Sequence, residues 1–460
     1  MKTTSLFFLF ISLNVFAQWE NVGPAKFTLE GIGQSAIESN NFGTIVGYVS
    51  NGKPAASKFN GEQWDLLGSE DVTDFVINDF DMAVYEDVPY IVYNKAATPR
   101  NLYMKKFDGE NWVDVGGSPF YNGNTQYLSI KLLGEIPYVV FQNTSTGKAN
   151  VMRFNGTTWE SVGNTEIGTG TLWNIDLQLI DSIPYISFRE FQGVGQNKLN
   201  VMRLEGNTWQ YVGGSVADLA SNSDNTNPLV ISSLTFEPVT KVPYITYAIK
   251  SPNINELSHV LITKKFESNS WIAVGEPIIN VRNTFEGPRS TFFANQITVA
   301  YTGVDPNSGN VKVCVRTFNG SSWEILGSSY FASGGLIDTV NFTEDGDYDL
   351  ASTPDFLYLS YSEDGPVDKR LSVRKIANPL TTNNTVKQQD ISVYPNPSKN
   401  IFFLETADSN PEWLIYNNLG QKILSGYGQE IDLSNQASGM YFLKIKSDQL
   451  NPQTIKLIKV

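Results

Sequence analysis

Short apolar runs alternate with turn-forming Asn, Asp, Gly and Pro along most of this chain. In the run Val88-Pro89-Tyr90-Ile91-Val92-Tyr93, both sets of alternating positions are apolar or aromatic. Related runs begin at Ile136, Ile183, Val242 and, without the Pro, at Phe356. A strand with two apolar faces fits a sheet stacked between two others, whereas a two-sheet sandwich leaves one face polar. The pattern therefore favours the stacked blades of a β-propeller.

A second pattern places a Trp shortly after an Asn-Gly or Asp-Gly turn. Phe59-Asn60-Gly61 is followed by Trp64 and Leu67-Gly68, and this unit recurs with Trp at positions 112, 159, 209, 271 and 323. Counted from Trp19, the spacings are 45, 48, 47, 50, 62 and 52 residues. Asn-Gly and Asp-Gly between apolar runs predict hairpins, and periods of this length indicate propellers or solenoids.

The ends of the repeat region set the number of blades. Each unit predicts four strands, the last of which carries the Trp. The strand of Trp19 has no other strands before it, and the last set, ending in residues 371–376, has no Trp strand after it. Joining the two completes a seventh blade. We therefore expect an all-β fold with a seven-bladed propeller over residues 18–377, built of four-stranded blades and closed by the N-terminal strand. An open array of β-units is the alternative, and closure is favoured because it protects the terminal strand edges.

The N-terminus has the features of a secretory signal peptide. Lys2 precedes an apolar run from Leu6 to Phe16, and Val15-Phe16-Ala17 suits cleavage before Gln18. The alternative is an N-terminal core strand. The single cysteine, Cys314, excludes an intrachain disulfide. No later segment has the length of a membrane span.

The last residues depart from the repeat. Residues 378–390 are polar and predict a linker, and residues 391–460 contain short strand-like runs typical of a small β-sandwich. Their motifs are Val393-Tyr394-Pro395-Asn396-Pro397, Tyr416-Asn417-Asn418-Leu419-Gly420, Ile431-Asp432-Leu433-Ser434, Ser438-Gly439-Met440-Tyr441 and a terminal Lys456-Leu457-Ile458-Lys459. In this order they resemble the C-terminal sorting domain of type IX secretion cargo. The resemblance implies a bacterium of the Bacteroidota, contact with the type IX machinery, and passage through the periplasm to release or to the outer cell surface.

Charge restricts the partners. The chain has 33 Lys and Arg against 47 Asp and Glu, a net charge of −14. Residues 391–460 hold six Lys and six acidic residues, so the acidity belongs to the propeller. An acidic protein is a poor electrostatic partner for nucleic acid or an anionic membrane. With His259 as the only histidine, a site that needs two imidazoles in one chain is excluded.

One set of polar residues has a regular place in the repeat. Nine positions before the marker Tyr of a unit lie Asp81, Ser129, Asp176 and Asp349. These positions fall at the start of the innermost predicted strands, which surround the central channel of a propeller. We expect them to form a ring that could hold a cation or a polar ligand. The alternative is a set of solvated residues at strand starts.

A calcium site is a further hypothesis. Asp345, Asp347 and Asp349 alternate in a loop with Gly346. Ca²⁺ takes several oxygen ligands, which loops with acids at every second position supply. An acidic, solvated turn is the alternative.

The sequence favours a secreted or cell-surface protein, expected to be a monomer, that binds a glycan or a protein without catalysing a reaction. No catalytic constellation stands out among its residues. The alternative is an extracellular carbohydrate-active enzyme, a glycosidase or lyase, with an acidic central pocket. A structural surface protein without a small ligand is the third possibility.

Overall fold

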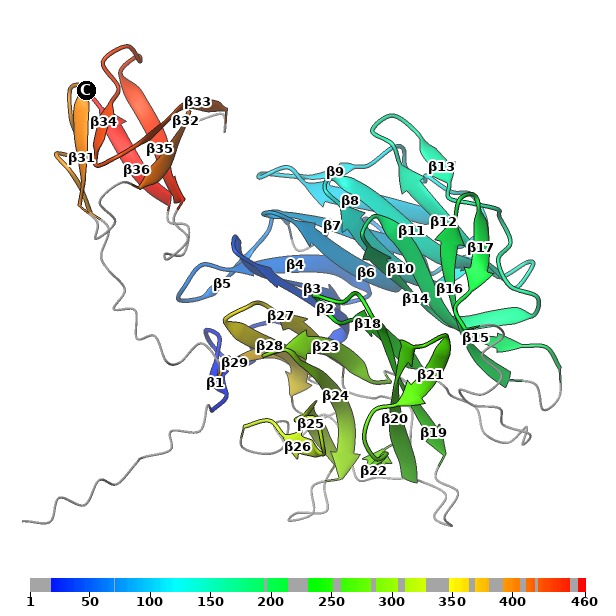
Figure 1. The fold of residues 1–460 in the computed structure, drawn as a ribbon. Helices are drawn as coiled ribbons and strands as arrows, with labels where there is room; N and C mark the ends of the chain where they lie inside the picture. Colours follow the sequence, from blue (N-terminus) through cyan, green and yellow to red (C-terminus); the bar gives the residue numbers. More distant parts are fainter. Residues whose placement is uncertain are drawn as a thin grey trace, which may run out of the picture. The chain divides into compact units, whose positions relative to one another are not determined.

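The computed structural model describes two compact units, residues 1–381 and 382–460, and each is considered by itself. The boundary between them falls inside the predicted linker 378–390. The described residues are 18–69, 71–193, 197–213, 231–250, 258–282, 287–304, 311–327, 347–363, 369–379, 392–405, 411–417, 421–446 and 454–460. The predicted signal peptide 1–17 lies outside them. All the regular elements described are β-strands (Figure 1). No helix in these ranges is long and apolar enough to cross a membrane.

Four sheets in the first unit each take four consecutive strands, paired antiparallel in chain order. The first holds β2 (Ile32–Asn40), β3 (Gly43–Ser50), β4 (Lys53–Phe59) and β5 (Trp64–Leu66). The second holds β6 (Ile77–Tyr85), β7 (Val88–Lys95), β8 (Leu102–Phe107) and β9 (Trp112–Asp114). The third holds β10 (Thr125–Leu133), β11 (Ile136–Asn143), β12 (Lys148–Phe154) and β13 (Trp159–Ser161). The fourth holds β14 (Thr171–Ile180), β15 (Ile183–Phe191), β16 (Asn197–Glu205) and β17 (Thr208–Tyr211).

The next two repeats differ from the expected separate blades because one added strand joins them into a nine-stranded sheet. β22 pairs with β20 of one repeat and with β24 of the next. The strands are β18 (Ser232–Phe236), β19 (Pro243–Lys250), β20 (Ser258–Glu267), β21 (Ser270–Ala273), β22 (Ile278–Arg282), β23 (Arg289–Phe293), β24 (Gln296–Val304), β25 (Val311–Phe318) and β26 (Trp323–Ile325).

The two ends of the repeat region meet in one sheet. β1 (Glu20–Asn21) pairs with β29, and the sheet order is β1-β29-β28-β27. The other strands of this sheet are β27 (Tyr348–Ser352), β28 (Phe356–Glu363) and β29 (Arg370–Ala377). Glu20 lies opposite Lys375, and Asn21 lies opposite Arg374. Residues more than 350 positions apart therefore share one antiparallel ladder.

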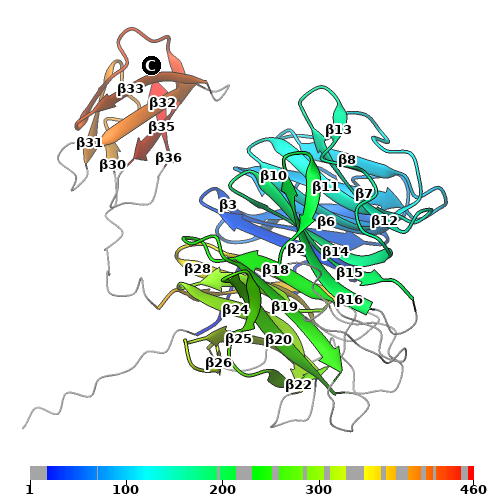
Figure 2. The same cartoon turned by 45° about the vertical axis from the view of Figure 1, so that its right-hand side comes forward.

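The first strands of the repeats lie side by side. In the described residues each contacts the next, in the series β2, β6, β10, β14, β18, β23 and β27, and β27 contacts β2. Figure 2 shows several of them converging at the middle of the first unit. Antiparallel sheets arranged in this way around a shared centre have the β-propeller architecture.

The repeated Trp residues join neighbouring sheets at their outer strands. The indole Nε1–H of Trp112 donates to the carbonyl of Leu67 at 2.8 Å, and that of Trp159 donates to Val115 at 3.0 Å. The same bond links Trp64 to Val22, Trp209 to Val162, Trp271 to Val212 and Trp19 to Leu326. Each carbonyl belongs to the residue before the repeated Gly. The Val-Gly or Leu-Gly of one repeat is therefore the docking point for the Trp of the next.

The second unit, over the predicted sorting domain, is a small sandwich of two sheets. One has the order β30-β31-β34 and the other the order β33-β32-β35-β36. The strands are β30 (Ser392–Tyr394), β31 (Ile401–Glu405), β32 (Glu412–Asn417), β33 (Lys422–Tyr427), β34 (Glu430–Asp432), β35 (Gly439–Lys446) and β36 (Thr454–Lys459). Phe402, Trp413 and Leu443 belong to one buried core that both sheets supply.

Candidate functional site

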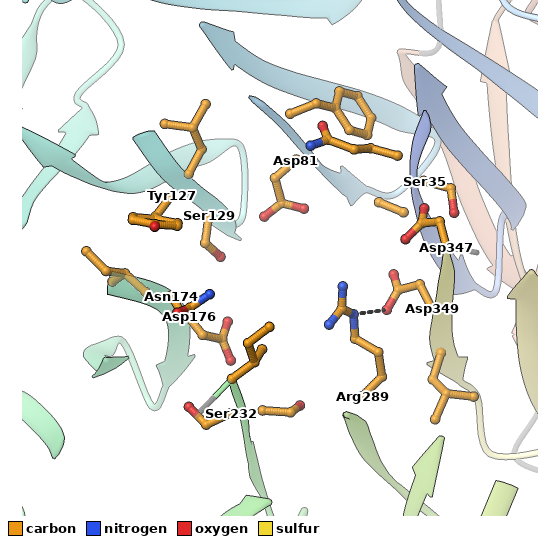
Figure 3. Close-up of a pocket in the computed structure, with 18 of the residues that line it drawn as sticks. Ser35, Asp81, Tyr127, Ser129, Asn174, Asp176, Ser232, Arg289, Asp347 and Asp349 are labelled. Atoms are coloured by element: carbon orange, nitrogen blue, oxygen red, sulfur yellow. Dashed lines mark ion pairs between the residues drawn. The ribbon is translucent and has the colours of Figure 1, made fainter. Parts of the chain in front are cut away.

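The first strands of the repeats line a cavity of about 350 Å³. All four residues of the predicted ring, Asp81, Ser129, Asp176 and Asp349, lie on its wall, and Figure 3 shows them around one open space. The regular place of these residues in the repeat thus corresponds to one place in space.

Hydrogen bonds explain why this position is so often Asp or Ser. Oδ2 of Asp81 accepts from the backbone N–H of Ile130 in the next repeat at 2.9 Å, and Oδ2 of Asp349 accepts from Ile37 at 3.0 Å. Asp176 accepts in the same way from Leu234, Ser129 from Leu177, and Ser233 from Ser290. Each of these side chains therefore joins its own first strand to the first strand of the following repeat.

These contacts define seven ring residues: Ala36, Asp81, Ser129, Asp176, Ser233, Arg289 and Asp349. Two of them cannot accept the usual hydrogen bond. Beside Ala36, the N–H of Met82 donates instead to Oδ1 of Asp81 at 2.8 Å. Arg289 reaches the next repeat with its side chain, and its Nε lies 3.5 Å from Oδ1 of Asp349 (Figure 3). Both oxygens of Asp81 and of Asp349 are consequently engaged within the protein.

Glu38 and Lys131 lie on the same wall and were not predicted from the sequence. Each stands two positions after a ring residue, so the period of two along a strand turns it toward the same side. Within the described residues, neither side chain has a hydrogen bond or an ion pair within 4.0 Å. The cavity thus contains one carboxylate and one ammonium that form no hydrogen bond with the described residues.

The charges in the cavity shift one another's pKa. Burial raises the pKa of the Glu38 carboxyl to about 7, an effect that Lys131 opposes and that Asp349 and Asp81 reinforce. Burial raises the pKa of Asp79 to about 6, although the N–H groups of Leu128 and Phe80 oppose this. The pKa values of Asp176 and Asp349 also lie above their ordinary values because of burial. Carboxylates with raised pKa values clustered in a cavity are a recognised sign of a functional site.

The predicted calcium residues are only partly described. Asp345 lies outside the described residues, whereas Asp347 and Asp349 both line the cavity. Among the side chains that the structure describes, no three His, Cys, Asp or Glu residues come close enough together to hold a metal ion. Calcium binding by Asp345, Asp347 and Asp349 therefore stays a prediction.

Comparison with known proteins identifies the C-terminal unit. Residues 392–460 match the family described as Secretion system C-terminal sorting domain, which confirms the assignment made from the sequence motifs. This domain directs export through the type IX secretion system to the cell surface or the medium. No curated protein matches the chain.

Several solved structures are similar to parts of this chain. The polysaccharide lyase Uly1 is 10% identical with a TM-score of 0.45, and the match covers 76% of this chain and 90% of that chain. A mutant of AofleA from Arthrobotrys oligospora is 13% identical with a TM-score of 0.44, covering 68% and 90%. A thermostable family-43 glycoside hydrolase is 12% identical with a TM-score of 0.33, covering 55% and 88%.

Proposed function

We propose that the chain is an extracellular seven-bladed β-propeller, closed by β1, whose central cavity binds a carbohydrate. The blade count is supported by the series of seven first strands in mutual contact, and closure is supported by the pairing of β1 with β29. We further propose that residues 1–17 are removed as a signal peptide, that residues 378–390 are a linker and that the source belongs to the Bacteroidota. The mature protein would act as a monomer.

The observation that carries this proposal is the pair of Glu38 and Lys131 on the cavity wall, whose side chains form no hydrogen bond with the described residues. A carboxylate accepts hydrogen bonds from hydroxyl groups and an ammonium donates to them, so together they suit a polyhydroxylated ligand. The ring residues instead hold neighbouring blades together. The volume, about 350 Å³, falls at the small end of the range of about 300–1,000 Å³ typical of ligand pockets. A single sugar or a chain end fits this size better than a long internal segment.

Glycan-array binding followed by isothermal titration calorimetry of the purified chain tests this proposal. We expect binding of at least one glycan, with a loss of about tenfold or more in affinity in Lys131→Met and in Glu38→Gln, since each removes a charge-assisted hydrogen bond. Glu110→Gln is the control, because Glu110 is exposed in the β8–β9 turn, away from the cavity. Binding that both cavity variants retain at full strength would contradict a central site.

A second candidate, a glycosidase, is favoured by the carboxylates that lie near Glu38 on the cavity wall. A glycosidase needs one protonated and one ionised carboxyl within about 5–10 Å of each other. Burial raises the pKa of Glu38 to about 7, and Asp349 and Asp81 are near enough to reinforce this shift. A screen for release of reducing sugars from the glycans that bind would decide between the two. Turnover that Glu38→Gln abolishes while binding persists would establish the enzyme, and binding without turnover would leave the non-enzymatic proposal in place.

A further inference from the structure

We infer that the sorting domain binds the export machinery through the outer face of its four-stranded sheet, and that the partner is a protein surface with an apolar centre and acidic side chains around it. This inference concerns the second unit and does not depend on the proposed carbohydrate site. It follows from the side chains that three sequence motifs place on this face, from the charge around them and from the closure of the nearest strand edge.

Four side chains form an apolar row on the outer face of the neighbouring strands β32, β35 and β36 (Figure 1). Met440 of β35 lies opposite Ile458 of β36, and Phe442 of β35 lies opposite Tyr416 of β32. Met440 is 43% exposed and Ile458 is 37% exposed, whereas Phe442 and Tyr416 are half-buried. The row therefore continues across three strands in contact with solvent.

The core of the domain does not explain the apolar row. Tyr416, Met440 and Ile458 come from three different sequence motifs of the sorting domain. The residues that alternate with them point inward and supply the buried core: Ile415, Tyr441, Leu443 and Leu457. Exposed apolar residues that gather in one place mark an interaction surface. Tyr, Phe and Met are also among the residues enriched in the centres of protein interfaces.

Positive charge surrounds the apolar row. Lys456 lies opposite Phe442, Lys422 lies opposite Tyr416, and both lysines are exposed. Lys444 follows Phe442 by two positions, so it faces the same side of the sheet. The balance of the described charged side chains on this face, with Glu412 as the acid, is 3 − 1 = +2. Such a face attracts an acidic partner.

The outer face of the other sheet has the opposite charge. Its described charged side chains are all acidic and exposed: Glu405, Glu430 and Asp432. It also has exposed apolar side chains, among them Ile401 and Phe403. The two faces of the sandwich are therefore similar in apolar exposure and differ in charge, so the second face serves as an internal control for the first.

The motif around Asn396 closes the free edge of β36. Nδ2 of Asn396 donates to the carbonyl of Lys456 at 2.6 Å, and Oδ1 accepts from the N–H of Ile458 at 2.9 Å. The N–H of Ser398 donates to the carbonyl of Ile458 at 3.0 Å, and the Ser398 carbonyl accepts from Val460 at 2.9 Å. Strand addition needs unpaired backbone groups at a sheet edge. Because these groups are occupied, a partner meets the side chains of the face instead.

The arrangement favours a protein partner over a lipid surface. Recognition of anionic lipids by charge typically uses clusters of about 4–8 Lys or Arg, whereas the described side chains of this face include three lysines. Protein interfaces combine an apolar, aromatic centre with a polar rim, as the row and its lysines do. The partner belongs to the export machinery because residues 392–460 match a sorting domain.

Export of the full chain from a host with the type IX machinery tests the inference. In the double variant Met440→Thr with Ile458→Thr, we expect the exported fraction to fall about fivefold or more, because residues at the centre of an interface carry most of its binding energy. Thr maintains a high strand propensity. The matched control is Ile401→Thr with Phe403→Thr on the other face, where the exposed fractions are 37% and 40%. This control should be exported at the wild-type level.

A charge reversal tests the acidic nature of the partner. Lys456→Glu should also reduce export, whereas Lys399→Glu should not, since Lys399 is an exposed residue of the loop between β30 and β31. Melting curves of all variants identify any that fail to fold. Equal export of Lys456→Glu and Lys399→Glu, both correctly melting, would contradict an acidic partner.

Photo-crosslinking identifies the partner without disturbing the fold of the whole face. The crosslinker p-benzoylphenylalanine is placed at position 440 in one full chain and at position 403 in another, and the adducts formed during export are identified by mass spectrometry. We expect an adduct with a protein of the export machinery from position 440 and not from position 403. An adduct with lipopolysaccharide alone, or one from position 403 alone, would overturn the inference. Wild-type export of the folded Met440→Thr and Ile458→Thr double variant would do the same, even if removal of the whole domain blocks export.

Discussion

Gly116 is the residue against which the Trp and the Phe of the following repeat pack. Its φ is +69°, and a Cβ built there would lie 2.5 Å from Cε2 of Phe154 and 2.5 Å from Nε1 of Trp159. The side chain of any other residue would therefore push the two sheets apart. This explains why a Gly follows the Val or Leu in every repeat, a regularity that the sequence displays but does not explain.

Gly116→Ala should destabilise the propeller more than Gly206→Ala. Gly206 has a similar φ of +62°, but a Cβ added there would meet no other atom within 4 Å. Its substitution therefore costs only the backbone strain, about 1–2 kcal/mol. At Gly116 the steric overlap should add about 1–3 kcal/mol. Urea unfolding of the two variants measures the difference. Equal losses would show that the contact with Trp159 does not restrict this position.

Glu38 should make the stability depend on pH. Its pKa is about 7 in the folded state against an ordinary 4.5, so the folded protein binds this proton more tightly than the unfolded chain. The stabilisation is complete below pH 4.5 and is lost as the pH rises through 7. Asp79, with a pKa of about 6, acts in the same direction.

Glu38→Gln should therefore flatten the profile of unfolding free energy between pH 5 and pH 8. We expect the wild type to lose on the order of 1–2 kcal/mol more than the variant over this range, a discounted value because the cavity admits water. Chemical denaturation at a series of pH values measures it, with Glu110→Gln as the control. Parallel profiles for wild type and Glu38→Gln would contradict the assignment.

Four cavity residues, Asp81, Ser129, Asp176 and Asp349, were predicted from the sequence, and Ser233, Glu38 and Lys131 were missed for different reasons. Counting nine back from the marker Tyr finds Asp81 and Asp176 because their hairpins have equal lengths. The same count from Tyr244 misses Ser233, since the β18–β19 hairpin is two residues longer. Glu38 lies in a repeat that has no Pro-Tyr marker. Lys131 could have been found, because it stands two positions after Ser129.

At the scale of the elements, the sequence predicts the four-stranded units of the repeat but not the added strand β22. Asn-Gly turns and Trp spacing predict the four-stranded units because in each unit the Trp packs against the preceding repeat in the same way. β22 was missed because its buried residues Ile278 and Val281 are three positions apart and do not alternate. Its pairing depends on two neighbouring repeats together, which no local pattern reveals.

At the scale of a strand, substitution of Trp19 tests whether the N-terminal strand closes the ring. Trp19 is 8% exposed and Trp209 is 6% exposed, and both donate Nε1–H to a carbonyl of the preceding repeat. If β1 is an integral blade strand, Trp19→Ala and Trp209→Ala should each cost about 3–5 kcal/mol. Thermal and urea unfolding compare the two. A negligible cost at Trp19 alone would indicate that the N-terminal strand is dispensable and that the ring is not closed by it.

The calcium hypothesis for Asp345, Asp347 and Asp349 can be tested by thermal unfolding. Both oxygens of Asp349 are already engaged, one by the N–H of Ile37 and one by Arg289. We therefore expect the melting temperature to change little between millimolar Ca²⁺ and EDTA. Binding at a hundredfold excess over the dissociation constant would add about 2.7 kcal/mol of stability. A rise in melting temperature that Asp347→Ala abolishes would contradict this expectation and establish the site.

At the scale of the whole molecule, the sorting domain and the candidate binding site belong to two different units of the chain. The net charge of −14 belongs to the residues before 391, because residues 391–460 contain equal numbers of basic and acidic side chains. The sorting domain also has its own buried core, which includes Phe402 and Trp413. Each unit thus has what it needs to fold without side chains from the other.

Removing residues 391–460 should block export without unfolding the propeller. In a host with the type IX machinery, we expect the truncated chain to accumulate in the periplasm with the thermal transition of the propeller unchanged, because its core and its seams lie entirely before residue 391. Cell fractionation and melting of the periplasmic product measure the two effects. The complementary fusion, a signal peptide and a reporter joined to residues 378–460, should reach the outside, since the sorting domain supplies the address by itself. Truncated protein in the medium at the wild-type level would show that export does not depend on this domain. A truncated chain that fails to fold would show instead that the two units depend on each other for stability.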